Sequence, residues 1–78
     1  MRYKTEIIIY QDDSGLVDVL KSKFSGDEYK IESGQINTGL NAVRVLAETS
    51  RLEFIHEVEK EVKKFGMAEI EIKMVRYL

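Results

Sequence analysis

The segment from Ser50 to Gly66 restricts the fold more than any other part of the chain. Its apolar residues recur at spacings of three and four: Leu52, Ile55, Val58, Val62 and Phe65. At about 100° per residue, this spacing gathers them on one side of an α-helix. Ser50 and Glu53 have the spacing of a capping box, and Gly66 can end the helix in a left-handed conformation. A helix with one apolar side must pack against another element, so the chain needs a second layer.

Two segments near the ends of the chain alternate between two sides with a period of two, which is typical of β-strands. In residues 3–10 (YKTEIIIY), one side carries Tyr3, Thr5, Ile7 and Ile9, and the other carries Lys4, Glu6, Ile8 and Tyr10. In Met67 to Leu78, the apolar side carries Ala68, Ile70, Ile72 and Met74, and the charged side carries Glu69, Glu71 and Lys73. We expect the last segment to be a half-buried strand.

The intervening residues predict a second helix and a hairpin. The run Gln11-Asp12-Asp13-Ser14-Gly15 suits a turn, and an oxygen of Asp12, Asp13 or Ser14 can cap a helix that starts there. The apolar side of that helix would contain Leu16, Val17, Leu20 and Phe24, and Gly26 would end it. Residues 28–36 and 41–48 predict two strands joined by a turn at 37–39. Gly34 would weaken the first of them or mark a bulge.

The predicted order is strand, helix, strand, strand, helix, strand. Its economical solution is an α+β, two-layer ferredoxin-like sandwich, with a four-stranded antiparallel sheet and both helices on one face. We expect residues 1–78 to form one domain, since 78 residues leave no room for a second core. The last strand would lie at an edge, where its charged side would blunt edge-to-edge pairing.

The small size of the chain favours a homodimer. A domain of this length buries only about 60% of its unfolded surface, so covering a sheet face with a partner would stabilise it. The helix-free face should carry Ile8, Tyr10, Val75 and Tyr77, which we interpret as a candidate interface. The alternative is an ordinary surface, since more than half of a normal protein surface is apolar.

Composition argues against several function classes. The chain has 12 Lys and Arg against 14 Asp and Glu, without a basic block, so direct nucleic-acid binding is not expected. It has no cysteine, which excludes thiolate metal sites and cysteine nucleophiles. No apolar run approaches the roughly 20 residues that span a bilayer, and no signal-type core follows Met1. We therefore expect a cytoplasmic protein with no membrane partner.

The residues that carry most enzyme chemistry are few and scattered. His56 is the only histidine and should face solvent, so a metal or catalytic role is not predicted. Asp12, Asp13 and Asp18 suit helix capping, although a cation site stays open as an alternative. Ser14 has no neighbouring base in sequence, and the glycines form no phosphate loop. The sequence thus predicts a protein that is not an enzyme and needs no cofactor.

The segment EIIIYQDDSGLVDVL, together with the βαββαβ order, resembles the opening of ACT domains. In that family a strand ends in an acidic, glycine-containing turn, and small molecules bind near the turn at a dimer interface. The resemblance implies a ligand site at Asp12, Asp13, Ser14 and Gly15. The Arg-Pro that usually precedes the glycine is replaced here by Asp13 and Ser14.

A second resemblance rests on the segment AETSRLEFIHEVEKEV and on the order of elements. It is similar in kind to the hairpin-to-helix passage of the small dimerising subunit of the KEOPS tRNA-modifying complex. Our leading hypothesis is a non-enzymatic dimerising module that binds a small ligand or a protein. The alternative is an accessory subunit of an RNA-processing complex.

Overall fold

The computed structural model describes residues 2–11, 15–35, 39, 41–66 and 68–77. The chain forms β1 (Arg2–Tyr10), α1 (Leu16–Lys23), β2 (Tyr29–Gln35), β3 (Asn41–Thr49), α2 (Phe54–Lys64) and β4 (Glu69–Tyr77). α1 ends three residues before Gly26, with Phe24 at its C-cap position, and α2 ends two residues before Gly66. The predicted order of elements is confirmed.

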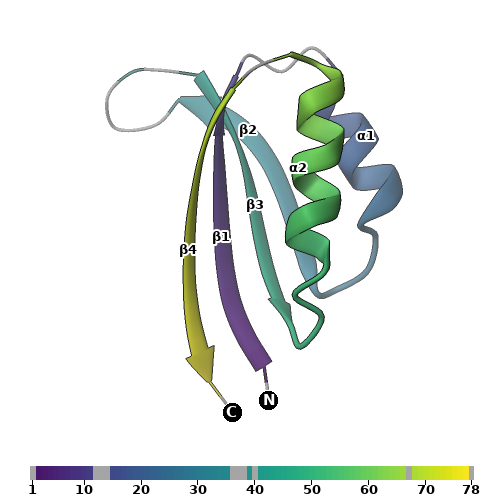
Figure 1. Cartoon of the computed structure of the whole chain (residues 1–78), viewed down its shortest axis with the longest axis vertical. Coiled ribbons are helices and arrows are strands. Elements are labelled where there is room, and N and C mark those ends of the chain that lie inside the picture. The colour runs from purple at the N-terminus through teal and green to yellow at the C-terminus, as the bar shows by residue number, and fades with distance from the viewer. Residues whose placement is uncertain (1, 12–14, 36–38, 40, 67, 78) are drawn as a thin grey trace.

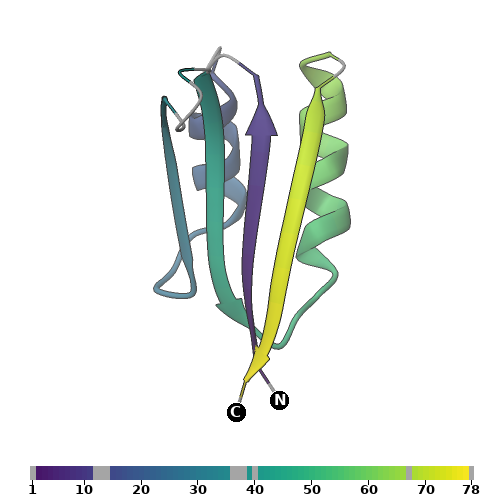
Figure 2. The same cartoon turned by 90° about the vertical axis from the view of Figure 1, so that its left-hand side faces the viewer.

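The four strands form one antiparallel sheet in the order β2-β3-β1-β4. Both helices lie on the same face of this sheet, and no helix of the described ranges lies on the other face (Figures 1 and 2). This arrangement is the predicted ferredoxin-like sandwich. The pairing of β2 with β3 continues without interruption through Gly34, which faces Ala42, so the possible bulge at Gly34 is absent.

The core lies between the sheet and the helices. Its fully buried side chains come from β1, β3 and both helices: Ile7, Ile9, Val43, Val45, Leu16, Leu20, Phe54, Val58 and Val62. The period of two in β1 is confirmed, because Thr5, Ile7 and Ile9 are buried whereas the intervening side chains are not. Burial of this apolar surface, at about 25 cal/mol per Å², is the main term that holds the two layers together.

The buried side of α2 differs from the predicted one. Phe54 has no exposed surface and packs against the rings of Phe24 and Tyr29, with centroids 6.3 and 5.7 Å away. Ile55 and Leu52, which the spacing places on the apolar side, are only half-buried. The helix is therefore rotated so that its apolar side is centred nearer to Phe54 than to Ile55.

The predicted capping box of Ser50 and Glu53 is wrong. The helix begins at Phe54, Glu53 occupies the N-cap position, and no side chain caps the first turn. Instead, the hydroxyl of Thr49 accepts a hydrogen bond from the Arg51 backbone N–H at 3.1 Å. This bond turns the chain before the helix starts, so Ser50 precedes the helix by too many residues to cap it.

The apolar side of β4 is covered for only part of its length. Ile70 is half-buried, but Ile72 and Met74 are 44% and 47% exposed. Figure 1 shows that β1 and β4 continue past the N-terminal end of α2, toward the two ends of the chain. The strand is thus less buried than its alternation predicts. Among the described residues, no helix combines the length and the apolar character that crossing a membrane requires.

Candidate functional site

The helix-free face of the sheet carries both charged and apolar side chains. Three rows cross it from β3 through β1 to β4: Arg44, Ile8 and Glu71 form the first, Leu46, Glu6 and Lys73 the second, and Glu48, Lys4 and Val75 the third. Acidic and basic residues alternate across these rows, so the face presents both signs of charge. Such a surface suits a partner that also carries both signs.

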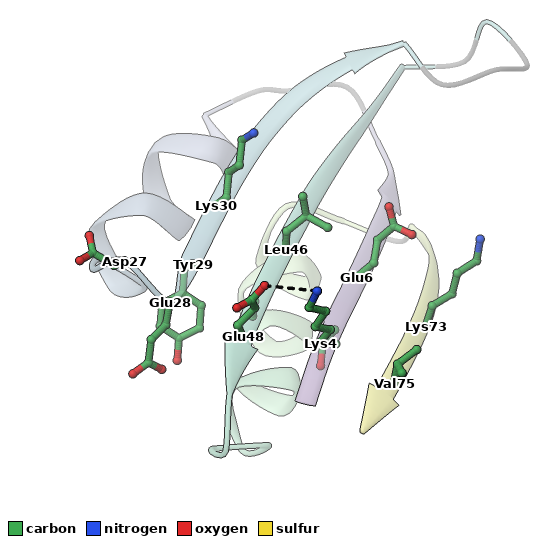
Figure 3. A pocket seen from close by; sticks show the side chains of 12 residues that line it. Lys4, Glu6, Asp27, Glu28, Tyr29, Lys30, Leu46, Glu48, Lys73 and Val75 are labelled. Atoms are coloured by element: carbon green, nitrogen blue, oxygen red, sulfur yellow. Dashed lines mark ion pairs between the residues drawn. The ribbon is translucent and has the colours of Figure 1, made fainter. Parts of the chain in front are cut away.

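A hollow of about 560 Å³ opens on this face (Figure 3). Leu46 and Val75 supply apolar surface, and Lys4, Glu48 and Lys73 are among the charged residues around it. Nζ of Lys4 lies 3.8 Å from a carboxylate oxygen of Glu48. An apolar patch ringed by lysines and glutamates can hold a small molecule by contact with its apolar part and by ion pairs at its ends.

Arg44 joins three strands on the same face. Its guanidinium donates to Glu32 on β2, with Nε 3.0 Å from Oε1, and to Glu6 on β1, with Nη1 3.4 Å from Oε2. The hydrogen bond from Arg44 holds the pKa of Glu32 below its usual value, and the same bond raises the pKa of Arg44. Because Arg44 is engaged by two carboxylates, it offers little unpaired positive charge to a phosphate backbone.

The three predicted interface residues whose side chains are described do not gather into one patch. Ile8 and Tyr10 are half-buried, and the Tyr10 hydroxyl donates a hydrogen bond to the carboxylate of Glu71. That bond raises the pKa of Tyr10, with a smaller contribution from burial and nearby carboxylates. Val75 is 64% exposed, but the row of Glu6 and Lys73 separates it from Ile8. The side chain of Tyr77, the fourth member, lies outside the described residues.

All the large, exposed apolar side chains of the described residues belong to β4: Ile72, Met74 and Val75. Ile72 and Met74 face the helix side, next to Ile7 and Thr5 of β1, whereas Val75 faces the open side next to Lys4. Sequence reasoning assigned Ile72 and Met74 to the buried side and missed them as surface residues. Alternation indicates the side on which a residue lies, but it does not indicate whether a helix covers it.

Sequence reasoning also missed Glu61, a buried carboxylate between the helices. Its side chain is 6% exposed, and its Oε1 lies 2.9 Å from Nζ of Lys23 on α1 and 3.1 Å from Nζ of Lys64. Hydrogen bonds from Lys23 and then Lys64 hold the pKa of Glu61 below its usual value. The sequence does contain a signal for the burial of Glu61: on a helical wheel, at about 100° per residue, Glu61 falls on the same side as Phe54 and Val58.

The predicted ligand site is mostly outside the described part of the chain. Asp12, Asp13 and Ser14 lie outside the described residues, so their capping and binding roles stay predictions. Gly15 is exposed and occupies the N-cap position of α1 with a left-handed φ of 93°.

His56 faces solvent as expected, with 88% of its side chain exposed. Among the described residues, no three His, Cys, Asp or Glu side chains are grouped so that they could hold a metal ion.

Comparison with known proteins adds no relative: no protein-family model matches the chain, and no curated protein matches it either. The fold therefore defines the class, a ferredoxin-like α+β protein, without assigning a family.

Proposed function

We propose that this chain is a non-enzymatic binding module of the cytoplasm that acts as a homodimer, with β4 as its contact surface. The observation that carries the proposal is that β4 holds all the large, exposed apolar side chains of the described residues, with Ile72 and Met74 on the helix side and Val75 on the open side. Neighbouring exposed apolar side chains on one side of a strand, such as Ile72 and Met74, mark a contact with another macromolecule.

The position of β4 at the edge of the sheet adds to this argument. Among the described residues β4 pairs only with β1, so a row of backbone N–H and C=O groups on its outer side is open to a further strand. Nine residues of β4 pair with β1 in an unbroken register, so no irregularity interrupts that edge. A second chain could thus gain backbone hydrogen bonds and apolar contacts at one place.

The ligand of such a module would be a small molecule or a protein segment that carries both charge signs. The hollow offers the apolar surface of Leu46 and Val75 next to positive charges, Lys4 and Lys73, and a negative charge, Glu48. The resemblance to ACT domains favours a second position, the turn of Asp12 to Gly15. A thermal-shift screen with amino acids, nucleotides and metal ions tests binding, and no shift with any of them would contradict the small-molecule form.

The alternative function is an accessory subunit of an RNA-processing complex, in line with the resemblance to the small KEOPS subunit. In that case β4 would bind a different protein rather than a second copy. The ion pairs of Arg44 with Glu6 and Glu32 favour protein contact over direct RNA contact. Co-purification with the subunits of an RNA-processing complex separates the two forms, because the homodimeric module should be isolated without them.

The homodimer is tested by sedimentation velocity over a wide concentration range. We expect the wild type to form a dimer and Ile72→Glu to shift it toward the monomer, because the new carboxylate would lie in the apolar contact. Ser33→Glu is the matched control: Ser33 is exposed on the helix side of the other edge strand, β2. A wild type that remains monomeric at the highest concentration reached contradicts the proposal.

A further inference from the structure

The proposed homodimer leaves open how the two chains meet, and the residues of β4 favour one answer. We infer that two copies pair their β4 strands antiparallel, with the two Ile72 residues facing each other on a two-fold axis. The two four-stranded sheets then join into one continuous sheet. This inference rests on the proposed homodimer and adds its geometry.

Symmetry limits the possible registers. Two identical edge strands that pair antiparallel within one sheet are related by a two-fold axis perpendicular to the sheet. The helices of both copies then lie on the same face, and side chains that face each other point to the same side. The axis must therefore pass through a pair of identical residues, which leaves Ile70, Glu71, Ile72, Lys73 and Met74 as centres near the middle of β4.

Charge disfavours three of the five centres. Centring on Glu71 or Lys73 would place that residue opposite its own copy, so two like charges would face each other. The centre at Glu71 would also place Glu69 opposite Lys73 of the other copy, but it retains the like-charged pair on the axis. Centring on Ile70 would place Glu69 opposite Glu71 of the second copy, twice. Directly opposed like charges destabilise a strand pair. A centre at Met74 has no such conflict, but it would place Ile72 opposite the charged Arg76 and would join no opposite charges.

The centre at Ile72 satisfies both sides of the sheet. On the open side, Glu71 of each copy faces Lys73 of the other, which makes two ion pairs related by symmetry. Lys73 has no ion-pair partner among the described residues of its own chain, so this contact would use an available charge. Glu71 and Lys73 therefore attract each other across the strand pair in this register, whereas charged residues of β4 oppose edge pairing in other registers.

On the helix side, the same register brings apolar residues together. Ile72 faces Ile72, and Met74 of each copy faces Ile70 of the other. Ile72 and Met74 are the large apolar side chains of the described residues that are exposed on this side of the sheet. Directly opposed side chains in an antiparallel pair have Cβ atoms about 4.5–5.5 Å apart, so each would gain an apolar neighbour.

The opposite edge of the sheet offers no comparable contact. Ile31 is buried on β2, Tyr29 is half-buried, and the exposed side chains of that strand in the described chain are polar or absent: Lys30, Ser33, Gly34 and Gln35. The apolar residues of the edges are therefore concentrated on β4, which favours a closed dimer over a continuing chain of molecules.

Charge exchange tests the register in the full chain. We expect E71K and K73E each to raise the dimer dissociation constant at least about tenfold at low salt, because two attractive pairs become repulsive. The double variant E71K/K73E should restore it to near the wild-type value, since the pairs reform with reversed charges. K30E reverses a lysine on the far edge strand and should change nothing. Circular dichroism checks that each variant is folded.

Cysteine crosslinking provides an independent readout, because the chain has no cysteine of its own. We expect I72C to form a disulfide-linked dimer rapidly under mild oxidation. M74C is the matched control on the same side of the strand. In this register the two residues at position 74 are displaced by four positions, about 13 Å, which is too far for a disulfide.

The outcomes separate this inference from the proposed function. A monomeric wild type overturns the homodimer and the register together. A dimeric wild type overturns the register alone if E71K/K73E stays as weak as the single variants, or if M74C crosslinks as fast as I72C. Restoration by the double variant together with selective crosslinking of I72C supports both.

Discussion

A carboxylate oxygen of Glu61 on α2 lies 2.9 Å from Nζ of Lys23 on α1, and this contact ties the two helices together above the sheet. Lys64, on the same helix as Glu61, lies 3.1 Å from the same oxygen. Glu61 is buried, so its charge depends on these two lysines rather than on water. The helices are therefore joined by an ion pair in addition to their apolar contacts.

Replacing Glu61 should make stability less dependent on pH. The pKa of Glu61 is lowered in the folded chain from the usual 4.5, so ionised Glu61 stabilises the fold above that pH. This stabilisation is lost as the pH falls through the lowered pKa. We expect Glu61→Gln to be less stable than the wild type at pH 7, and the difference to shrink in acid. Urea unfolding at several pH values measures it.

Glu57→Gln serves as a control, since it removes an exposed carboxylate from the same helix. Its pH profile should follow that of the wild type. If the free energies of unfolding of the wild type and Glu61→Gln differ by the same amount at all pH values, the stabilising role of ionised Glu61 is contradicted.

Phe54 should contribute more to stability than Ile55, although the apolar pattern alone ranks Ile55 in the middle of the helix stripe. Phe54 has no exposed surface and Ile55 is half-buried. We expect Phe54→Ala to lower the free energy of unfolding by about 3–5 kcal/mol, and Ile55→Ala by less. If Phe54→Ala does not fold, Phe54→Leu should lose about 1 kcal/mol and permit a measurement. Equal losses at positions 54 and 55 would be incompatible with the observed rotation of α2.

Thr5 should be replaceable by valine with a gain in stability. Its side chain is 2% exposed, and its Oγ1 forms no hydrogen bond with the described residues. Valine has a similar shape without the hydroxyl, so it removes the unfavourable burial of an unpaired polar group. We expect Thr5→Val to raise the free energy of unfolding by about 1 kcal/mol in urea. Thr5→Ser keeps the hydroxyl and loses a methyl group, so it should destabilise; a loss with Thr5→Val would show that the hydroxyl is paired.

Gly15 should be sensitive to substitution because of its backbone conformation. Its φ of 93° is unfavourable for residues with a Cβ atom, whereas a Cβ built there would lie 4.0 Å from the Phe65 ring and would not clash. We expect Gly15→Ala to lower the free energy of unfolding by about 1 kcal/mol. Gly34→Ala is the control, since Gly34 lies in a strand with open space around it, and it should be neutral or slightly stabilising. Equal effects at both glycines would refute the backbone explanation.

The sequence predicted the order of elements because periodicity is a local property. The alternation of Thr5, Ile7 and Ile9 identified the buried side of β1, and the spacing of Val58 and Val62 identified a helix with one apolar side. The errors of the sequence prediction concern the rotation of α2 and the residue at which it begins. With Leu52 and Ile55 included, the predicted apolar side of α2 was centred too far from Phe54. The spacing of Ser50 and Glu53 is that of a capping box, which the chain does not form.

The candidate site was less predictable than the fold. Tyr10 and Val75 lie on the open side, as predicted, but the row of Glu6 and Lys73 between them follows only from the strand register. The burial of Glu61 was missed because a carboxylate on the apolar side of a helix is buried only if cations lie close to it. One of these cations, Lys23, belongs to a different helix, so the sequence of α2 does not show that it is near.

The sequence by itself determined which residues prefer helix or strand and which side of each element is apolar, because these properties depend on neighbours within a few positions. Only the tertiary structure decided how far that apolar side is covered. β1 and β4 continue past the N-terminal end of α2 (Figure 1), and Ile72 and Met74 are exposed although their alternation is that of buried residues. Coverage depends on the relative length and placement of distant elements, which no local pattern encodes.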